Sequence, residues 1–155
     1  MIQRVQSIWL LLAVITLICL FFLPLLTKTV DGIGHGVYTT GLHREMNGES
    51  GSGYSVTFAF SLITLNIAAA LLSFGAIFFF KNRRLQKGII LSAILTIIAL
   101  AALCIYHGQQ LPGGFSGASI AAGTFLPVVA LIFCLLAIRG IRKDEQLLRS
   151  ADRLR

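Results

Sequence analysis

Long apolar stretches separated by short polar segments dominate the chain. No Asp, Glu, Lys or Arg interrupts residues 5–27, 50–80, 88–106 or 108–138. A helix needs about 20 mostly apolar residues to cross the hydrocarbon core of a bilayer. The last stretch begins with HGQQLPGGFSG at 107–117, which is rich in turn-forming residues and is typical of a loop. The pattern therefore predicts four membrane-spanning helices, over about residues 5–26, 54–80, 88–106 and 119–138.

The remaining segments are predicted to form a long loop over 27–53, a short loop over 81–87 and a tail over 139–155. The long loop is rich in glycine, and the stretch VYTT within it favours a short hairpin. The tail is expected to be helical, because Glu145 and Arg149 form a favourable pair four residues apart. The predicted fold class is all-α: a single membrane domain over 1–155, built as a four-helix transmembrane bundle with a helical charged C-terminal tail.

The distribution of Lys and Arg predicts the orientation of the bundle. Arg4, four basic residues of the 81–87 loop and six of the tail make up eleven of the 13 basic residues. Lys28 and Arg44 lie on the opposite side. Because short loops rich in Lys and Arg stay in the cytoplasm, both termini and the 81–87 loop are predicted to be cytoplasmic.

The composition agrees with a membrane protein. Hydrophobic residues make up 56% of the 155 residues and charged residues only 12%, whereas soluble domains carry about 25% charged residues. The formal net charge of +7 is explained by topology, so we expect no nucleic-acid partner. The three cysteines lack the spacing of a zinc or haem motif and are expected to be buried apolar side chains.

The predicted spans contain no Asp, Glu, Lys, Arg or His. Proton relays and ion pumps generally place an ionisable group at membrane depth, so this pattern argues against such a function. The candidate intramembrane polar residues are Asn66, Ser73, Thr96 and Thr124. Asn66 is expected to form a hydrogen bond between helices. The alternative is that these residues, with a bend at Pro127, line a path for a solute.

All three histidines, His35, His43 and His107, lie on the side opposite the termini. Histidines can bind zinc or haem, but no HxxxH spacing is present and a glycine-rich loop holds ligands poorly. No nucleophile with a base, pair of carboxylates or phosphate-binding glycine loop can be assembled. We predict no catalytic residues, no cofactor and no metal site, and a haem or metal redox role is the weakest alternative.

Polar and charged residues gather on the predicted cytoplasmic side and form a candidate interaction surface. Its members are Arg4, Gln6, Asn82, Arg83, Arg84, Gln86, Arg142, Lys143, Asp144, Glu145, Arg149, Asp152 and Arg153. The acidic residues of the tail are expected to pair with Arg4, Arg83 or Arg84. The surface would contact anionic lipids of the inner leaflet or dock a membrane or cytoplasmic protein. Alternatively, it only anchors the ends of the helices.

Three stretches of this surface carry a family resemblance: MIQRVQSIW at the start, KNRRLQ at 81–86 and IRKDEQLLRSADRLR at the end. In combination they resemble the uncharacterised bacterial membrane family called domain of unknown function 4293. The resemblance covers essentially the whole chain. It implies a four-helix integral protein of the bacterial inner membrane, and it implies no activity.

Together these observations predict a multi-pass membrane protein that is not an enzyme. We expect a non-catalytic accessory or scaffold subunit with a basic cytoplasmic face, because ionisable groups are absent from the spans and concentrated at that face. A small transporter or channel for a neutral or lipid-like solute is the alternative.

Overall fold

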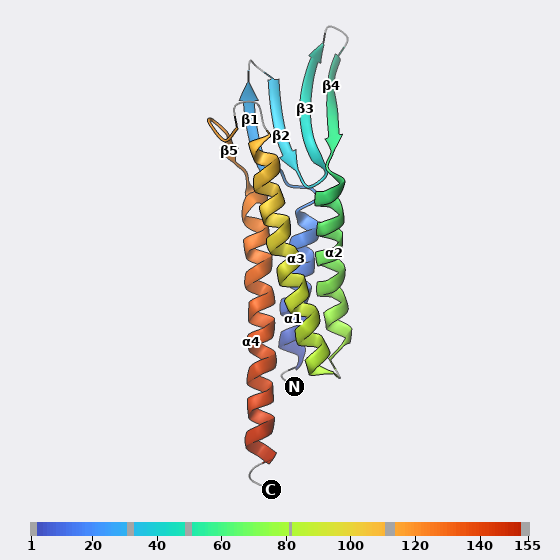
Figure 1. Cartoon of the computed structure of the whole chain (residues 1–155), viewed down its shortest axis with the longest axis vertical. Helices are drawn as coiled ribbons and strands as arrows, with labels where there is room; N and C mark the ends of the chain where they lie inside the picture. The colour runs from blue at the N-terminus through green and yellow to red at the C-terminus, as the bar shows by residue number, and fades with distance from the viewer. Residues whose placement is uncertain (1–2, 31–32, 49–50, 81, 111–113, 153–155) are drawn as a thin grey trace.

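In the computed structural model, four helices lie side by side and a five-stranded antiparallel sheet stands at one end of them (Figure 1). The structure describes residues 3–30, 33–48, 51–80, 82–110 and 114–152. The prediction of an all-α fold is wrong: the chain is mixed α/β, and the segment expected to be a long loop forms most of the sheet. We call the end with the sheet the sheet end, and the opposite end the terminal end.

The helices are α1 (Gln3–Cys19), α2 (Phe60–Phe78), α3 (Arg83–Gln109) and α4 (Leu126–Asp152), and a 3-10 turn, η1 (Ala122–Phe125), leads into α4. Within the described residues, three helical segments are long and apolar enough to cross a membrane: Phe60–Phe78, Arg83–Gln109 and Ala122–Leu147. The apolar part of α1, Gln6–Cys19, is shorter. The chain is therefore a multi-pass membrane protein, and α4 continues into the charged tail.

The helices begin and end at different residues from those predicted. Residues 20–25 leave the first helix, because Pro24 lacks an N–H group and the Leu25 N–H donates to Val37 O in the sheet (2.7 Å). Residues 54–58 and 119–120 belong to strands rather than to spans. Apolar composition alone does not distinguish a buried strand from the end of a helix.

The strands are β1 (Leu26–Val30), β2 (Ile33–Tyr38), β3 (Gly41–Gly48), β4 (Gly51–Phe58) and β5 (Ser119–Ile120), in the order β4-β3-β2-β1-β5. The first four strands follow one another along the chain. β5 comes from the connection between α3 and α4, and it pairs with β1. The sheet therefore ties the connection between the last two helices to the connection between the first two.

Gly41 begins β3, directly after the turn formed by Thr39 and Thr40. Its φ of 138° lies in the region that favours glycine. A Cβ atom at this position would lie only 2.0 Å from Thr57 O on β4. Residue 41 therefore has to be glycine for β3 to begin so close to β4.

The register sorts the side chains of the sheet onto two faces, because successive residues of a strand point in opposite directions. Leu26, Val37 and Leu42 pair across β1, β2 and β3 and share one face. Leu26 and Val37 are buried, so this face packs toward the helices and we call it the bundle face. The other face carries Gly36 and His43, and we call it the open face.

The core between the helices combines large apolar side chains with small ones. α4 places Ala130, Cys134 and Ala137 on one buried stripe, at spacings of four and three residues. Small side chains let helix backbones approach closely. α4 packs most extensively on α1, and α2 on α3. Many large apolar side chains on the outward faces are exposed, which suits helices in contact with lipid tails.

Candidate functional site

Two polar contacts join α4 to its neighbours at the terminal end. Gln6 Nε2 on α1 donates a hydrogen bond to Asp144 Oδ2 on α4, and both residues are buried. Lys87 Nζ on α3 lies 2.5 Å from Glu145 Oε2 on α4, and both side chains are partly exposed. These contacts join residues that are 138 and 58 positions apart in the chain.

The close approach of α1 and α4 at this end involves Gly140. A Cβ atom at residue 140 would lie 3.1 Å from Gln6 Cγ, so a larger residue would push the Gln6 side chain aside. On the neighbouring helix pair, Gln86 of α3 is buried and its Nε2 donates to Ala76 O on α2 (3.1 Å). The amides of Gln6 and Gln86, together with the Lys87–Glu145 pair, therefore fasten all four helices to one another.

The structure divides the predicted interaction surface into residues that make contacts between helices and residues that are exposed. Gln6, Gln86, Asp144 and Glu145 make the contacts described above. Asn82 begins α3, where its Oδ1 accepts a hydrogen bond from the Leu85 N–H (3.4 Å). Arg84, Arg142 and Lys143 are exposed, and Arg83 is partly exposed. The side chains of Arg4, Arg149, Asp152 and Arg153 lie outside the part of the chain that the structure describes.

The observed partners of the acidic residues differ from the expected arginines. Glu145 contacts Lys87, and Asp144 accepts from the amide of Gln6. The second carboxylate oxygen of Asp144 is buried and has no hydrogen-bond partner within the described residues. Lys87 is missing from the predicted surface, although its charge and its place in the 81–87 loop were available signals.

α4 projects beyond the other helices at the terminal end (Figure 1). Its 27 residues correspond to about 40 Å at 1.5 Å per residue. Ile141 and Asp144 lie on its buried stripe, and Leu147 continues this stripe at the same three-residue spacing but is 47% exposed. The projecting segment therefore presents an apolar position about one turn beyond the exposed cations of Arg142 and Lys143, which lie at its base.

Within the membrane-spanning region, Asn66 joins two helices. The residue lies on α2 and is fully buried, and its Nδ2 donates to Leu17 O on α1 (3.1 Å). The Leu17 carbonyl lies near the end of α1, where the last carbonyl groups of a helix lack partners within it. Ser73, two turns further along α2, is also buried. The Asn66 side chain thus supplies a hydrogen-bond donor to a carbonyl group near the end of α1, and it holds α2 against α1.

The two threonines among the predicted intramembrane polar residues also bond to backbone carbonyls. Thr96 Oγ1 donates to Ser92 O of its own helix (2.8 Å). Thr124 Oγ1 donates to Leu25 O, and the same carbonyl accepts from the Ala121 N–H (3.1 Å). Thr124 therefore helps to hold the start of α4 against the segment that follows α1.

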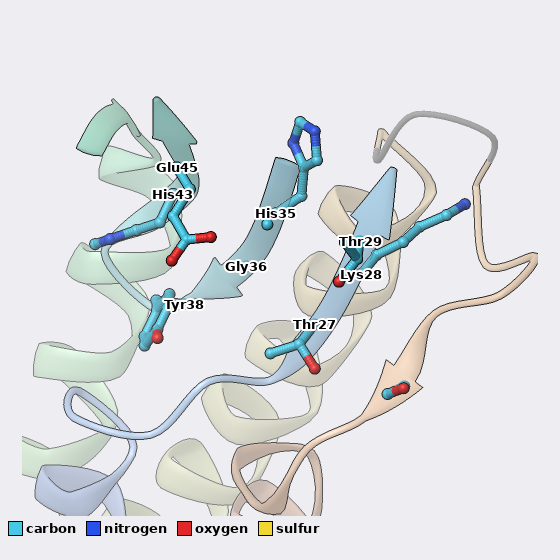
Figure 2. A pocket seen from close by; sticks show the side chains of 10 residues that line it. Thr27, Lys28, Thr29, His35, Gly36, Tyr38, His43 and Glu45 are labelled. Atoms are coloured by element: carbon cyan, nitrogen blue, oxygen red, sulfur yellow. The ribbon is translucent and has the colours of Figure 1, made fainter. Parts of the chain in front are cut away.

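A polar hollow of about 220 Å³ lies on the sheet (Figure 2). Two glycines of β2 make room for its side chains. A Cβ atom on Gly34 would lie 2.5 Å from Glu45 Oε2, and one on Gly36 would lie 2.9 Å from the Tyr38 ring. The carboxylate and the ring can therefore lie across β2. The hollow is lined by Thr27, Lys28, Thr29, Gly34, His35, Gly36, Tyr38, His43, Glu45 and Ser119.

The three histidines come from β2, β3 and α3 and have separate surroundings. The His43 ring lies 4.4 Å from the Tyr38 ring, centroid to centroid, and its Nε2 lies 2.8 Å from Thr40 Oγ1. His107 Nδ1 lies 3.2 Å from Gln110 Oε1. Within the described residues, no group of three or more His, Cys, Asp or Glu side chains is placed to hold a metal ion.

A second cavity, of about 340 Å³, lies between the sheet-end parts of α3 and α4. Its lining is almost entirely apolar and also includes residues of β1 and β5. The lining residues are Leu25, Leu26, Ala101, Cys104, Ile105, Phe115, Ile120, Thr124, Pro127 and Val128. The sequence gives no signal for this cavity, because the pairing of β5 with β1 closes its upper side.

Comparison with known proteins places the chain in a family. A family model described as "Domain of unknown function (DUF4293)" matches residues 2–154, essentially the whole chain. The chain belongs to this family. The match confirms the resemblance carried by the two terminal stretches and the 81–86 loop. A comparison with curated proteins found no match. The family description assigns no activity, so function is argued below from geometry.

Proposed function

We propose that the protein is a non-catalytic accessory or scaffold subunit of the membrane, which binds a protein partner through the projecting end of α4. The projection of α4 beyond the other helices is the observation that carries this proposal. A helix that only crossed the bilayer would need no turns beyond its neighbours. Here those turns keep a leucine exposed on the continuation of a buried stripe.

The polar contacts at the terminal end support this role, because they hold the projecting helix in a defined direction. The Gln6–Asp144 contact is buried, and a buried polar group that lost its partner would cost about 1–3 kcal/mol. The Lys87–Glu145 pair holds the adjacent turn of α4 from the α3 side. A helix held from two sides is pre-organised, which lowers the entropic cost of binding.

The side chains on the projection and at its base favour a particular chemistry in the partner. Amphipathic helices bind in apolar grooves through residues spaced three and four apart. Leu147 would enter such a groove, and the exposed cations of Arg142 and Lys143 would face an acidic rim. The partner would therefore carry an apolar groove with carboxylates along its edge.

The proposed setting is the bacterial inner membrane, with the terminal end in the cytoplasm. The concentration of Lys and Arg at that end supports this orientation. The partner would then be a cytoplasmic protein or the cytoplasmic part of another membrane protein.

The alternative of a solute transporter or channel has less support. Its main candidate residue, Asn66, donates to a backbone carbonyl of α1 and is fully buried. The hydroxyls of Thr96 and Thr124 also satisfy carbonyls. These bonds serve the packing of the helices, although Asn66 Oδ1 and Ser73 Oγ are buried without a hydrogen-bond partner among the described residues.

The test is the composition of the native particle, extracted in mild detergent from its own cells. We expect a mass well above the 16.8 kDa of the chain, with a second polypeptide at constant ratio. The double charge reversal Arg142→Glu with Lys143→Glu should release that polypeptide. The matched control is Arg84→Glu, because Arg84 is an equally exposed cation at the same end that lies on α3 rather than on α4.

Three outcomes would contradict the proposal. A bare monomer or homo-oligomer in wild-type membranes would remove the partner. Equal release of the polypeptide by Arg84→Glu would show that general basic charge, and not the α4 projection, holds it. Loss of binding to anionic phospholipid vesicles in the double variant, with no co-purifying polypeptide in wild type, would make the tail a lipid contact instead of a dock.

A further inference from the structure

The apolar cavity between α3 and α4 opens toward the surface that these helices present to lipid. Ile105 on α3, Ile120 on β5 and Val128 on α4 line it and are all more than half exposed. Both helices belong to segments long and apolar enough to cross a membrane. α4 packs less extensively on α3 than on α1, which leaves room for the cavity between them.

The chemistry of the cavity fits a hydrocarbon chain. A volume of about 340 Å³ lies at the lower end of the range of about 300–1,000 Å³ for small-molecule sites. Apart from the weakly polar thiol of Cys104, the polar side-chain group in its lining is the hydroxyl of Thr124, which already donates to Leu25 O. Water in such a space would find few hydrogen-bond partners, whereas an acyl chain needs none.

A cation lies at the sheet-side rim of this cavity. Leu26 lines the cavity, and Lys28 lies two residues further along β1 on the same face of the sheet. Lys28 Nζ donates to Gly114 O (3.1 Å), and the next residue, Phe115, forms part of the cavity wall. Figure 2 shows the Lys28 side chain extending away from His43 and Glu45. The ammonium group therefore lies close to the mouth of the cavity.

The charges around this rim favour an anion. Among the described residues of the sheet, Glu45 is the one that carries a carboxylate. Its oxygen lies over Gly34 on the open face. The register places Lys28 opposite His35 on the other face, the bundle face, whereas Arg44 lies one strand further away. The positive charge of Lys28, which donates to Gly114 O beside the cavity wall, therefore favours an anionic group at this rim.

We propose that the cavity holds one acyl chain of an anionic phospholipid from the leaflet on the sheet side, and that Lys28 contacts its phosphate. An anionic phospholipid combines the two chemistries that the structure places side by side, an apolar chain and a negative phosphodiester next to it. This site is independent of the proposed docking of α4, which lies at the opposite end of the molecule.

The experiment measures how much phospholipid stays bound to the purified chain. The protein is reconstituted with equal amounts of phosphatidylglycerol and phosphatidylcholine, extracted in mild detergent and weighed by native mass spectrometry. We expect one phosphatidylglycerol to be retained in preference to phosphatidylcholine. Lys28→Gln should reduce that retention about five-fold, the effect of one lysine at an anionic membrane surface, and Lys28→Arg should restore it.

Variants of the cavity lining test the part of the site that would hold the acyl chain. Ala101→Phe fills the cavity from α3 and should remove both lipids from the retained complex. Ala102→Phe is its matched control, because residue 102 is exposed and does not line the cavity. Arg44→Gln is the matched control for the cation, because Arg44 lies on the same face two strands away from Lys28. Both controls should retain phosphatidylglycerol as wild type does.

Three results would overturn the proposal. Equal retention of the two lipids by wild type would show a groove filled by any lipid, without recognition of charge. Unchanged retention in Ala101→Phe would place the bound lipid elsewhere. Displacement of phosphatidylglycerol by millimolar glycerol 3-phosphate would show a site for free phosphate esters rather than for a lipid. A monodisperse size-exclusion profile of each variant excludes misfolding as the cause of a loss.

Discussion

Replacement of Gly123 by alanine tests how the start of α4 is held at the sheet end. Gly123 lies in η1, and its N–H donates to Pro24 O (3.0 Å). A Cβ atom added here would lie 2.4 Å from Pro24 O and 2.9 Å from Leu23 O. Both are backbone atoms, which cannot move aside as the end of a flexible side chain can. The two segments would have to separate.

The size of the effect follows from this geometry. An ordinary contact begins at 3.4 Å, so the Cβ atom and Pro24 O would have to separate by about 1 Å. That movement would lengthen the Gly123–Pro24 hydrogen bond and strain the neighbouring bond from the Ala121 N–H to Leu25 O. Overpacking costs about 1–3 kcal/mol, and an unsatisfied buried polar group costs about 1–3 kcal/mol. We expect Gly123→Ala to lower the free energy of unfolding by about 2–4 kcal/mol.

The assay is reversible unfolding in mixed micelles, followed by far-ultraviolet circular dichroism. Gly88→Ala serves as the matched control, because Gly88 lies within α3 and an added Cβ atom would meet nothing within 4 Å. Alanine favours the helix over glycine by about 1 kcal/mol, so this substitution should raise stability. The same chemical change is thus expected to have opposite signs at two positions.

One result would refute the reasoning. If Gly123→Ala unfolded at the same denaturant fraction as wild type, η1 could not lie against the Leu23–Pro24 backbone as described. If Gly88→Ala were destabilised as strongly, the assay would be reporting a general effect of replacing glycine.

Three further predictions concern the packing of the helices and the sheet. Gly41→Ala should destabilise by about 3 kcal/mol or more in the same assay, because its φ of 138° disfavours a side chain and Thr57 O blocks the space; stability equal to wild type would contradict the turn. Asn66→Leu should cost about 0.5–2 kcal/mol, the range for a hydrogen bond between membrane helices. The exposed Thr64→Val should change stability by less than about 0.5 kcal/mol, and equal effects of the two would remove the special role of Asn66. A double-mutant cycle of Lys87→Gln and Glu145→Gln should give a coupling below about 1 kcal/mol that weakens with salt, because both side chains are partly exposed; a larger, salt-independent coupling would indicate a buried pair.

Local composition was enough to predict much of the membrane-spanning part of the chain. Uninterrupted apolar residues identified the cores of α2, α3 and α4. A long apolar helix is stable in a bilayer whichever segments pack beside it. The favourable spacing of Glu145 and Arg149 likewise predicted the helix of the tail, which is observed as far as Asp152. Among candidate site residues, the pattern singled out Asn66 and the acidic residues Asp144 and Glu145, but not their partners.

The sheet and the sites depended on contacts between distant residues. The stretch at 54–58 reads as the start of an apolar span, yet it forms β4 because β3 offers a row of backbone partners. β5 exists only because β1 lies beside it, and this pairing closes the cavity between α3 and α4. The Gln6–Asp144 contact joins residues 138 positions apart. Hydrophobicity is a property that each residue carries alone, so the sequence by itself determined which segments enter the membrane. Strand pairing, cavities and buried polar contacts are properties of pairs of segments, so only the tertiary structure decided them.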